Sequence, residues 1–255
     1  MKNVYLLIVI VICLVSCNNE TKKNNEISDE TTTDSQETSL VKEGKGVKDV
    51  EGNVYKTIVL GDQEWMASNL KTSKYNDGTT IPNEIDDIEW EYIETPAWCY
   101  YNNDSKNNNT YGKLYNWYAI SPETNGDKNV CPSGWHVPST SEWNDLVEYL
   151  GGNMSETVGG DLKESGTKHW KSPNTNATNA TLFTALPAGY RQGTADQGGA
   201  NLGQFLEIGN YGSWWSATES NAEWSDDFSI SYDNGYANVV SHTKDFGFSV
   251  RCLKD

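Results

Sequence analysis

Basic residues are scarce in this sequence. It has 19 Lys and Arg against 36 Asp and Glu, which gives a formal net charge of −17 at pH 7. Nucleic-acid-binding proteins neutralise phosphates with Lys and Arg, and electrostatic adhesion to anionic lipid needs a basic face. The composition therefore argues against both kinds of partner. Cations, neutral glycans and other proteins remain as candidate ligands or partners.

The sequence also lacks an apolar run long enough to span a membrane. The longest apolar run, residues 4–15, has 12 residues, and a transmembrane helix needs about 20. Lys2 precedes this run, and Leu14-Val15-Ser16-Cys17 ends it. This pattern is typical of a bacterial lipoprotein signal. We expect removal of residues 1–16, a lipid on Cys17, and an exported protein anchored in the cell envelope at the outer membrane. The alternative is an ordinary signal peptide with a chance cysteine.

Aromatic residues are absent from residues 18–48, which are mostly Asn, Thr, Ser, Glu, Asp and Lys. Such a segment cannot bury enough apolar surface to offset the entropy of ordering it. We therefore expect residues 17–48 to be the lipidated cysteine and a disordered tether. All ten Trp lie in residues 49–255, a length that suits one folded domain.

Cysteine is rare in the expected domain. Only Cys99, Cys131 and Cys252 follow Cys17, so at most one disulfide can form among them. We expect Cys131 to pair with Cys252, because Cys131 precedes a helix signal and Cys252 lies on the apolar face of a final strand. A Cys99–Cys131 bond and three reduced thiols are the alternatives, and export makes the reduced state the less favoured of these.

Catalytic and metal-binding motifs are missing as well. The three His residues have no zinc spacing, and the sequence contains no Gly-x-Ser-x-Gly and no phosphate-binding glycine loop. Calcium could be bound by the acidic pairs at 86–87 and 226–227 or by the Asn-rich loop at 102–109. None of these matches a defined calcium loop. We read them as solvated loops and expect no metal or other cofactor.

The clearest local signal is a helix at residues 139–150. Ser139 and Glu142 have capping-box spacing. Trp143, Leu146 and Val147 then recur on one helical face, and two glycines follow the helix.

Short strand signals dominate elsewhere. The pattern predicts a hairpin at residues 54–66, a short helix near 112–120, and strands at 182–191, 211–218 and 246–252. Asn234-Gly235 predicts a type I′ hairpin turn, with Ile230 facing Val239. We therefore expect an α+β fold: a loop-rich mixed domain with short antiparallel strands and two short helices.

Several segments together resemble the Fibrobacter succinogenes major paralogous domain, which is common in secreted proteins and lipoproteins of Bacteroidota. They include Gln63-Glu64-Trp65-Met66, Gly112-Lys113-Leu114-Tyr115-Asn116-Trp117 and Cys131-Pro132-Ser133-Gly134-Trp135-His136-Val137-Pro138, with further matches at 54–57, 67–70, 100–104, 186–191, 214–218 and 247–252. The family has no established activity to carry over.

A more distant resemblance involves residues 214–218 and 247–252, which are similar to segments of C-type-lectin-like and formylglycine-generating-enzyme-like domains. It implies a loop-rich fold with a small twisted sheet. Formylglycine-generating enzymes use a close pair of cysteines in their C-terminal part. Cys252 is alone there, so their activity is not implied.

Aromatic side chains are the one feature with value for binding, because an aromatic face complements the C–H face of a sugar ring. The ligand-binding candidates are Trp214, Trp215, Trp224, Tyr190 and Arg191. Since Trp214 and Trp215 are adjacent in a strand, they point to opposite sides, and one of them could be partly exposed. The favoured function is a non-catalytic binding module for glycan or protein. The alternatives are an extracellular enzyme acting on polysaccharide and a structural or adhesive envelope protein.

Overall fold

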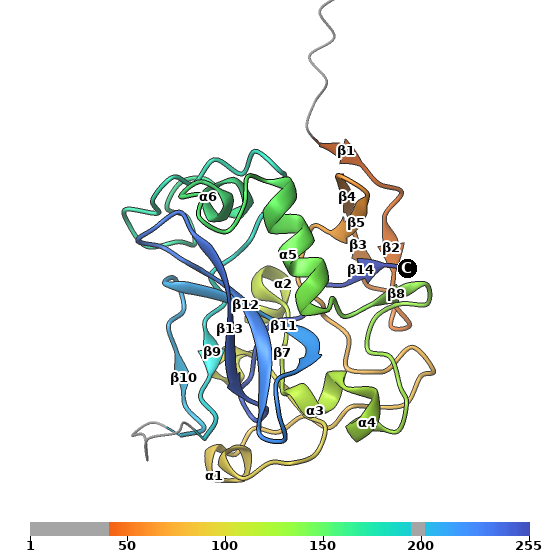
Figure 1. The fold of residues 1–255 in the computed structure, drawn as a ribbon. Coiled ribbons are helices and arrows are strands. Elements are labelled where there is room, and N and C mark those ends of the chain that lie inside the picture. The colour runs from red at the N-terminus through yellow and green to blue at the C-terminus, as the bar shows by residue number, and fades with distance from the viewer. Residues whose placement is uncertain (1–40, 195–201) are drawn as a thin grey trace, which may run out of the picture. The chain divides into compact units, whose positions relative to one another are not determined.

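The computed structural model describes residues 41–194 and 202–255 (Figure 1). The expected signal peptide, Cys17 and most of the expected tether lie outside the described residues. The fold is α+β, with several small antiparallel sheets. The described part contains six helices where the sequence predicted two: α1 (Asp87–Glu91), α2 (Asn107–Tyr111), α3 (Trp117–Ile120), α4 (Pro122–Asn125), α5 (Thr140–Tyr149) and α6 (Val158–Leu162). All except α5 have four or five residues, which is too short to show a hydrophobic period.

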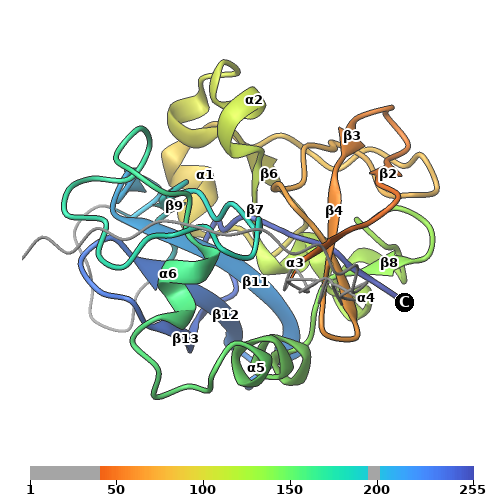
Figure 2. The ribbon, with the colours of Figure 1, turned by 90° about the horizontal axis from the view of Figure 1, so that it is seen from above.

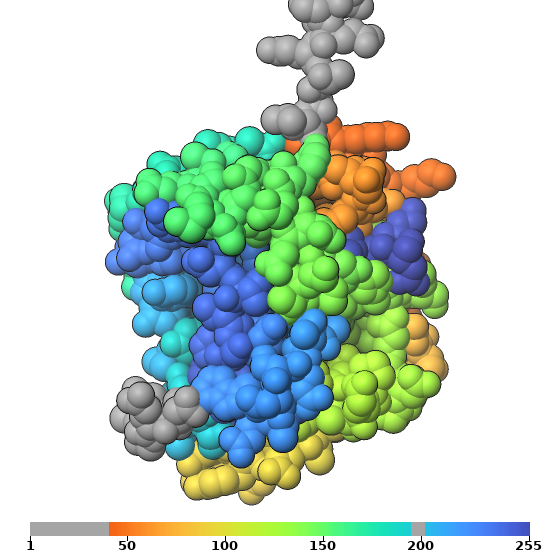
Figure 3. Space-filling view, viewed as in Figure 1, coloured from red at the N-terminus to blue at the C-terminus, as the bar shows by residue number. Residues whose placement is uncertain are grey.

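The longest strands form a three-stranded antiparallel sheet. It consists of β11 (Tyr211–Glu219), β12 (Trp224–Ser231) and β13 (Ala237–Thr243), in that order. Helix α5 packs against one face of this sheet, and Figure 3 shows its green residues against the blue strands. The rings of Trp143 and Phe228 stack there with centroids 4.3 Å apart. Strands β9 (Tyr190–Arg191) and β10 (Phe205–Leu206) lie on the other side (Figures 1 and 2).

A second sheet joins the two ends of the described chain. Its order is β1 (Lys42–Glu43), β4 (Thr57–Leu60), β5 (Gln63–Met66), β14 (Leu253–Lys254) and β8 (Trp135–His136). Strand β2 (Val47–Lys48) pairs with β3 (Val54–Tyr55). The tether prediction is therefore wrong for residues 42–48, where backbone pairing with the domain stabilises residues whose side chains carry little apolar surface.

The central helix confirms the capping-box prediction. The Ser139 hydroxyl accepts the amide of Glu142, and the amide of Ser139 donates to the Glu142 carboxylate at 2.7 Å. Trp143, Leu146 and Val147 are buried. The predicted hairpin at 54–66 is also present as β4 and β5, which pair across a turn at Gly61-Asp62.

Other predicted elements are shorter than expected. The predicted helix at 112–120 begins only at Trp117, where the Asn116 side chain caps it. The residues before it form β7 (Leu114–Tyr115), which pairs with β6 (Trp98–Cys99). In the predicted strand at 182–191, Leu182 and Thr184 have positive φ, so only β9 is a strand. The predicted final strand at 246–252 forms only isolated β-bridges, and the chain then continues into β14.

The predicted register of the last hairpin is wrong by two residues. Ile230 pairs with Ala237, and Phe228 pairs with Val239. Neither Asn234 nor Gly235 is among the residues with positive φ, so the turn is not type I′. Contacts from distant segments determine its shape. The buried ammonium group of Lys163 donates to the carbonyls of Ser231 and Asn234, at 3.0 and 2.8 Å.

A disulfide joins Cys131 to Cys252, with their Cα atoms 5.9 Å apart. This is the pairing that we favoured from the sequence, and Cys99 is buried as a free thiol. The bond connects the turn before α5 to the residue that precedes β14.

Candidate functional site

Two of the predicted ligand-binding residues, Trp214 and Trp215, are completely buried. They point to opposite sides of β11, as expected, but both sides are covered. The Trp214 indole donates to the side chain of Asn69 at 2.8 Å. The Trp215 indole donates to the carbonyl of Tyr115 at 2.7 Å. The prediction that one of them is partly exposed is therefore wrong, because the C-terminal segment covers the face that α5 leaves free.

Arg191 is also fully buried, and its role in the structure is to hold segments together. Its guanidinium lies over the Trp90 ring, 4.4 Å from the centroid. It donates to the carbonyls of Gly203, Glu84 and Asp86 and to the Asp87 carboxylate. A surface ligand cannot reach this side chain, so Arg191 is not a binding residue of the kind that we predicted.

Tyr190 and Trp224 are half-buried. Trp224 begins β12 opposite Thr243 and does not line the main groove described next. Tyr190 does line it. Of the five predicted candidates, only Tyr190 belongs to this groove.

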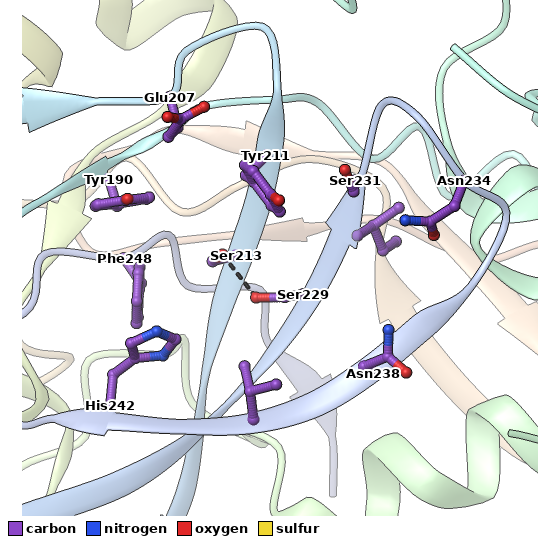
Figure 4. Close-up of a pocket in the computed structure, with 12 residues that line it drawn as sticks. Tyr190, Glu207, Tyr211, Ser213, Ser229, Ser231, Asn234, Asn238, His242 and Phe248 are labelled. Atoms are coloured by element: carbon purple, nitrogen blue, oxygen red, sulfur yellow. Dashed lines mark hydrogen bonds between the residues drawn. The ribbon is translucent and has the colours of Figure 1, made fainter.

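The groove lies on the face of the β11–β13 sheet that α5 does not cover, and it has a volume of about 530 Å³. Figure 4 shows its lining side chains. They are Tyr190, Glu207, Tyr211, Ser213, Ser229, Ile230, Ser231, Asn234, Asn238, Val240, His242 and Phe248. A wider hollow of about 670 Å³ lies beside β1 to β4. The described residues that line this hollow include no His, and the one aromatic residue among them, Tyr55, is fully buried. The groove on the sheet is therefore the better candidate.

Strand pairing brings the polar floor of the groove together. Ser213 lies opposite Ser229, and Ser229 lies opposite Asn238. Side chains alternate along each strand, so these residues share one face, while Phe228 belongs to the core cluster under α5. The Ser213 and Ser229 hydroxyls are 2.7 Å apart and hydrogen-bonded (Figure 4).

A hydrogen-bonded chain continues below this floor. The Ser229 hydroxyl donates to Asp227 at 2.6 Å, and Nδ1 of His242 lies 2.6 Å from the other Asp227 oxygen. Asp227 is fully buried, whereas the His242 side chain is about one-third exposed. Burial raises the pKa of the Asp227 carboxyl, and the hydrogen bonds with His242 and Ser229 offset only part of that rise.

Aromatic rings form one wall of the groove. Phe248 makes edge-to-face contacts with Tyr190 and with His242, at centroid distances of 6.0 and 5.2 Å. Tyr211 is 39% exposed and lies across the groove mouth from Tyr190, with Glu207 beyond both rings (Figure 4). Burial raises the pKa of Tyr190, and the nearby charge of Glu207 adds to the rise.

A family model, the Fibrobacter succinogenes major domain, matches residues 58–254. The chain belongs to this family. No significant match was found among curated proteins or solved structures, so the likeness to C-type-lectin-like and formylglycine-generating-enzyme-like domains stays a prediction. Within this Fibrobacter succinogenes major domain, the matched residues include all three strands of the groove sheet.

The lining of the groove in this Fibrobacter major domain is rich in hydroxyl and amide side chains. Glu207 is the only acid among the described lining residues, whereas glycoside hydrolysis uses two carboxyl groups across the bond. The serine hydroxyls bond to each other and to Asp227, and within the described residues neither of them is hydrogen-bonded to His242, whose Nδ1 pairs with Asp227. Across residues 41–194 and 202–255, no three His, Cys, Asp or Glu side chains cluster as metal ligands.

Sequence reasoning missed most of this site. Tyr211, Glu207 and His242 come from different segments, and their proximity depends on the sheet and on the β9–β10 pair. One signal was available: Ser225, Asp227, Ser229 and Ser231 alternate with larger residues along β12, which indicates a polar face.

Proposed function

We propose that this protein is an exported, lipid-anchored binding module that takes a glycan in the groove on the β11–β13 sheet. The observation that carries the proposal is the combination of exposed tyrosine with a row of hydroxyl and amide side chains in one groove. A sugar ring presents an apolar C–H face and a rim of hydroxyls, so it needs both kinds of contact.

The polar side chains are held in place before a ligand arrives. Hydrogen bonds fix the Ser213 and Ser229 hydroxyls. The backbone carbonyl of Asn234 accepts a hydrogen bond from Lys163, which fixes the position of that residue. Fixed polar groups lose little freedom on binding, which favours affinity. The described residues that line the groove include no Lys or Arg, so a glycan rich in carboxylate or sulfate groups finds no cationic side chain among them.

A glycan array probed with the full chain in detergent micelles tests this proposal. We expect binding to a restricted set of glycans and a loss of about tenfold or more in Tyr211→Ala, in line with the energy of aromatic contacts. Tyr92→Ala is the matched control, because Tyr92 is 72% exposed and lies outside the groove. Equal binding by both variants and the wild type excludes the groove as the site. A complete lack of glycan binding favours a protein ligand or a structural role.

The lipid anchor is a separate part of the proposal, supported by the sequence around Cys17. No helix in the part of the chain that the structure describes has the length and apolar character of a membrane span. We expect wild type to partition into the detergent phase and Cys17→Ser to stay in the aqueous phase. If both partition alike after loss of residues 1–16, the anchor is not on Cys17.

One observation favours a second candidate, an enzyme acting on polysaccharide. His242 lines the groove, and its Nδ1 is hydrogen-bonded to the buried Asp227 carboxyl. This arrangement can orient the imidazole as a general base. Incubation of the bound glycan with the protein, followed by measurement of released reducing ends, separates the two functions. Release that is lost in His242→Gln supports the enzyme, and stable binding without release supports the module.

A further inference from the structure

Among the described residues that line the groove, Glu207 is the only acid, and no described ion pair gives it a counter-charge. We infer that the preferred glycan carries free amino groups, and that the Glu207 carboxylate binds one of them as an ammonium. This inference rests on the proposed function and specifies the chemical class of ligand for the same groove.

Among the described residues, the Glu207 carboxylate has one hydrogen-bond partner. Its Oε2 accepts the side-chain amide of Asn210 at 2.6 Å. None of the ion pairs in the described residues includes Glu207. A half-buried carboxylate without a cation is stabilised when a ligand supplies one.

The backbone at Glu207 has an unusual conformation. Its φ is +64°, in the left-handed region that non-glycine residues rarely adopt. The amides of Asn210 and Tyr211 both donate to the Glu207 carbonyl, at 2.9 and 3.1 Å, and close the turn. This turn places the carboxylate beside Tyr190 and Tyr211 (Figure 4).

Two tyrosine rings beside a carboxylate suit an ammonium group. The faces of aromatic rings attract cations, and the carboxylate adds direct charge pairing. An amino sugar satisfies both contacts at once, because its C–H face packs on a ring while its amine meets Glu207. Acetylation of that amine removes the charge, so the acetylated sugar loses the pairing with Glu207.

Calorimetric titration of the full chain in detergent micelles tests the inference. The probes are β-1,4-linked hexamers of glucosamine, N-acetylglucosamine and glucose, at a pH low enough to keep the amine protonated. We expect the glucosamine hexamer to bind wild type about tenfold more tightly than the other two. Glu207→Gln keeps an acceptor for Asn210 but removes the charge, and we expect it to abolish this preference.

Glu148→Gln is the matched control. It removes one charge from an exposed position on α5, on the opposite side of the sheet, and we expect it to keep the full preference. If both variants lose the preference to the same extent, the net negative charge attracts the polycation and the inference fails. If wild type binds all three hexamers equally, the inference fails and the proposed function stands. If no hexamer binds, the inference fails, and the glycan array decides separately whether the proposed function stands.

Discussion

Removal of the Cys131–Cys252 disulfide should cost this protein a large part of its stability. The bond closes a loop of 121 residues and ties the segment before α5 to the C-terminal strand. Both cysteines are fully buried in a core cluster. The perturbation that we propose is the double variant Cys131→Ala/Cys252→Ala, which opens the loop without placing a polar group in the core.

The magnitude follows from the length of the loop. Closing a loop of this size lowers the entropy of the unfolded chain enough to contribute about 5 kcal/mol. For a domain of this size, 1 kcal/mol shifts the melting temperature by about 2–4 °C. We therefore expect the double variant to melt about 10–20 °C below wild type.

Differential scanning calorimetry under non-reducing conditions measures this shift. Cys99→Ala is the matched control, because Cys99 is a buried cysteine outside the disulfide. It loses only local packing, and we expect its melting temperature to fall by a few degrees. A double variant that melts no lower than Cys99→Ala would refute the reasoning.

Three further predictions concern stability. Trp143→Ala removes a fully buried ring from the core under α5, and denaturant titration should show a loss of about 3–5 kcal/mol. Burial alone lowers the pKa of His136, but hydrogen bonds to Asp255 and Glu142 outweigh it and raise that pKa. The raised pKa contributes to the free energy of unfolding; this contribution is complete below about pH 6.5 and is lost as pH rises through the folded-state pKa. In that pH range, His136→Gln should therefore flatten the pH dependence of stability. Burial lowers the pKa of Lys163 to about 8. The unfolded state then binds more protons between about pH 8 and 10, so wild type should gain stability in that window relative to Lys163→Met.

Local signals predicted the parts of the fold that local contacts determine. The capping box of α5 needs only residues three apart, and it was readable from Ser139 and Glu142. The last hairpin was different. Its turn is held by Lys163, which lies 68 and 71 residues away in sequence from the two residues whose backbone carbonyls it binds, and no hairpin rule includes such a contact.

The candidate site was harder to predict for a related reason. Alternation showed that Trp214 and Trp215 point apart, but it could not show that both side chains are buried. The groove depends on Tyr190 in β9 lying near Tyr211 and His242 in the sheet. That proximity is a consequence of tertiary packing, and the local patterns of a single sequence do not predict it.

The most direct test of the binding site is an NMR titration of the isotope-labelled full chain in detergent micelles with the tightest-binding oligosaccharide. If the groove is the site, the largest chemical-shift changes occur at its floor and wall, at Ser213, Ser229, Asn238 and His242. Changes concentrated around α5, on the opposite side of the sheet, or an absence of localised change at saturating ligand, contradict the account.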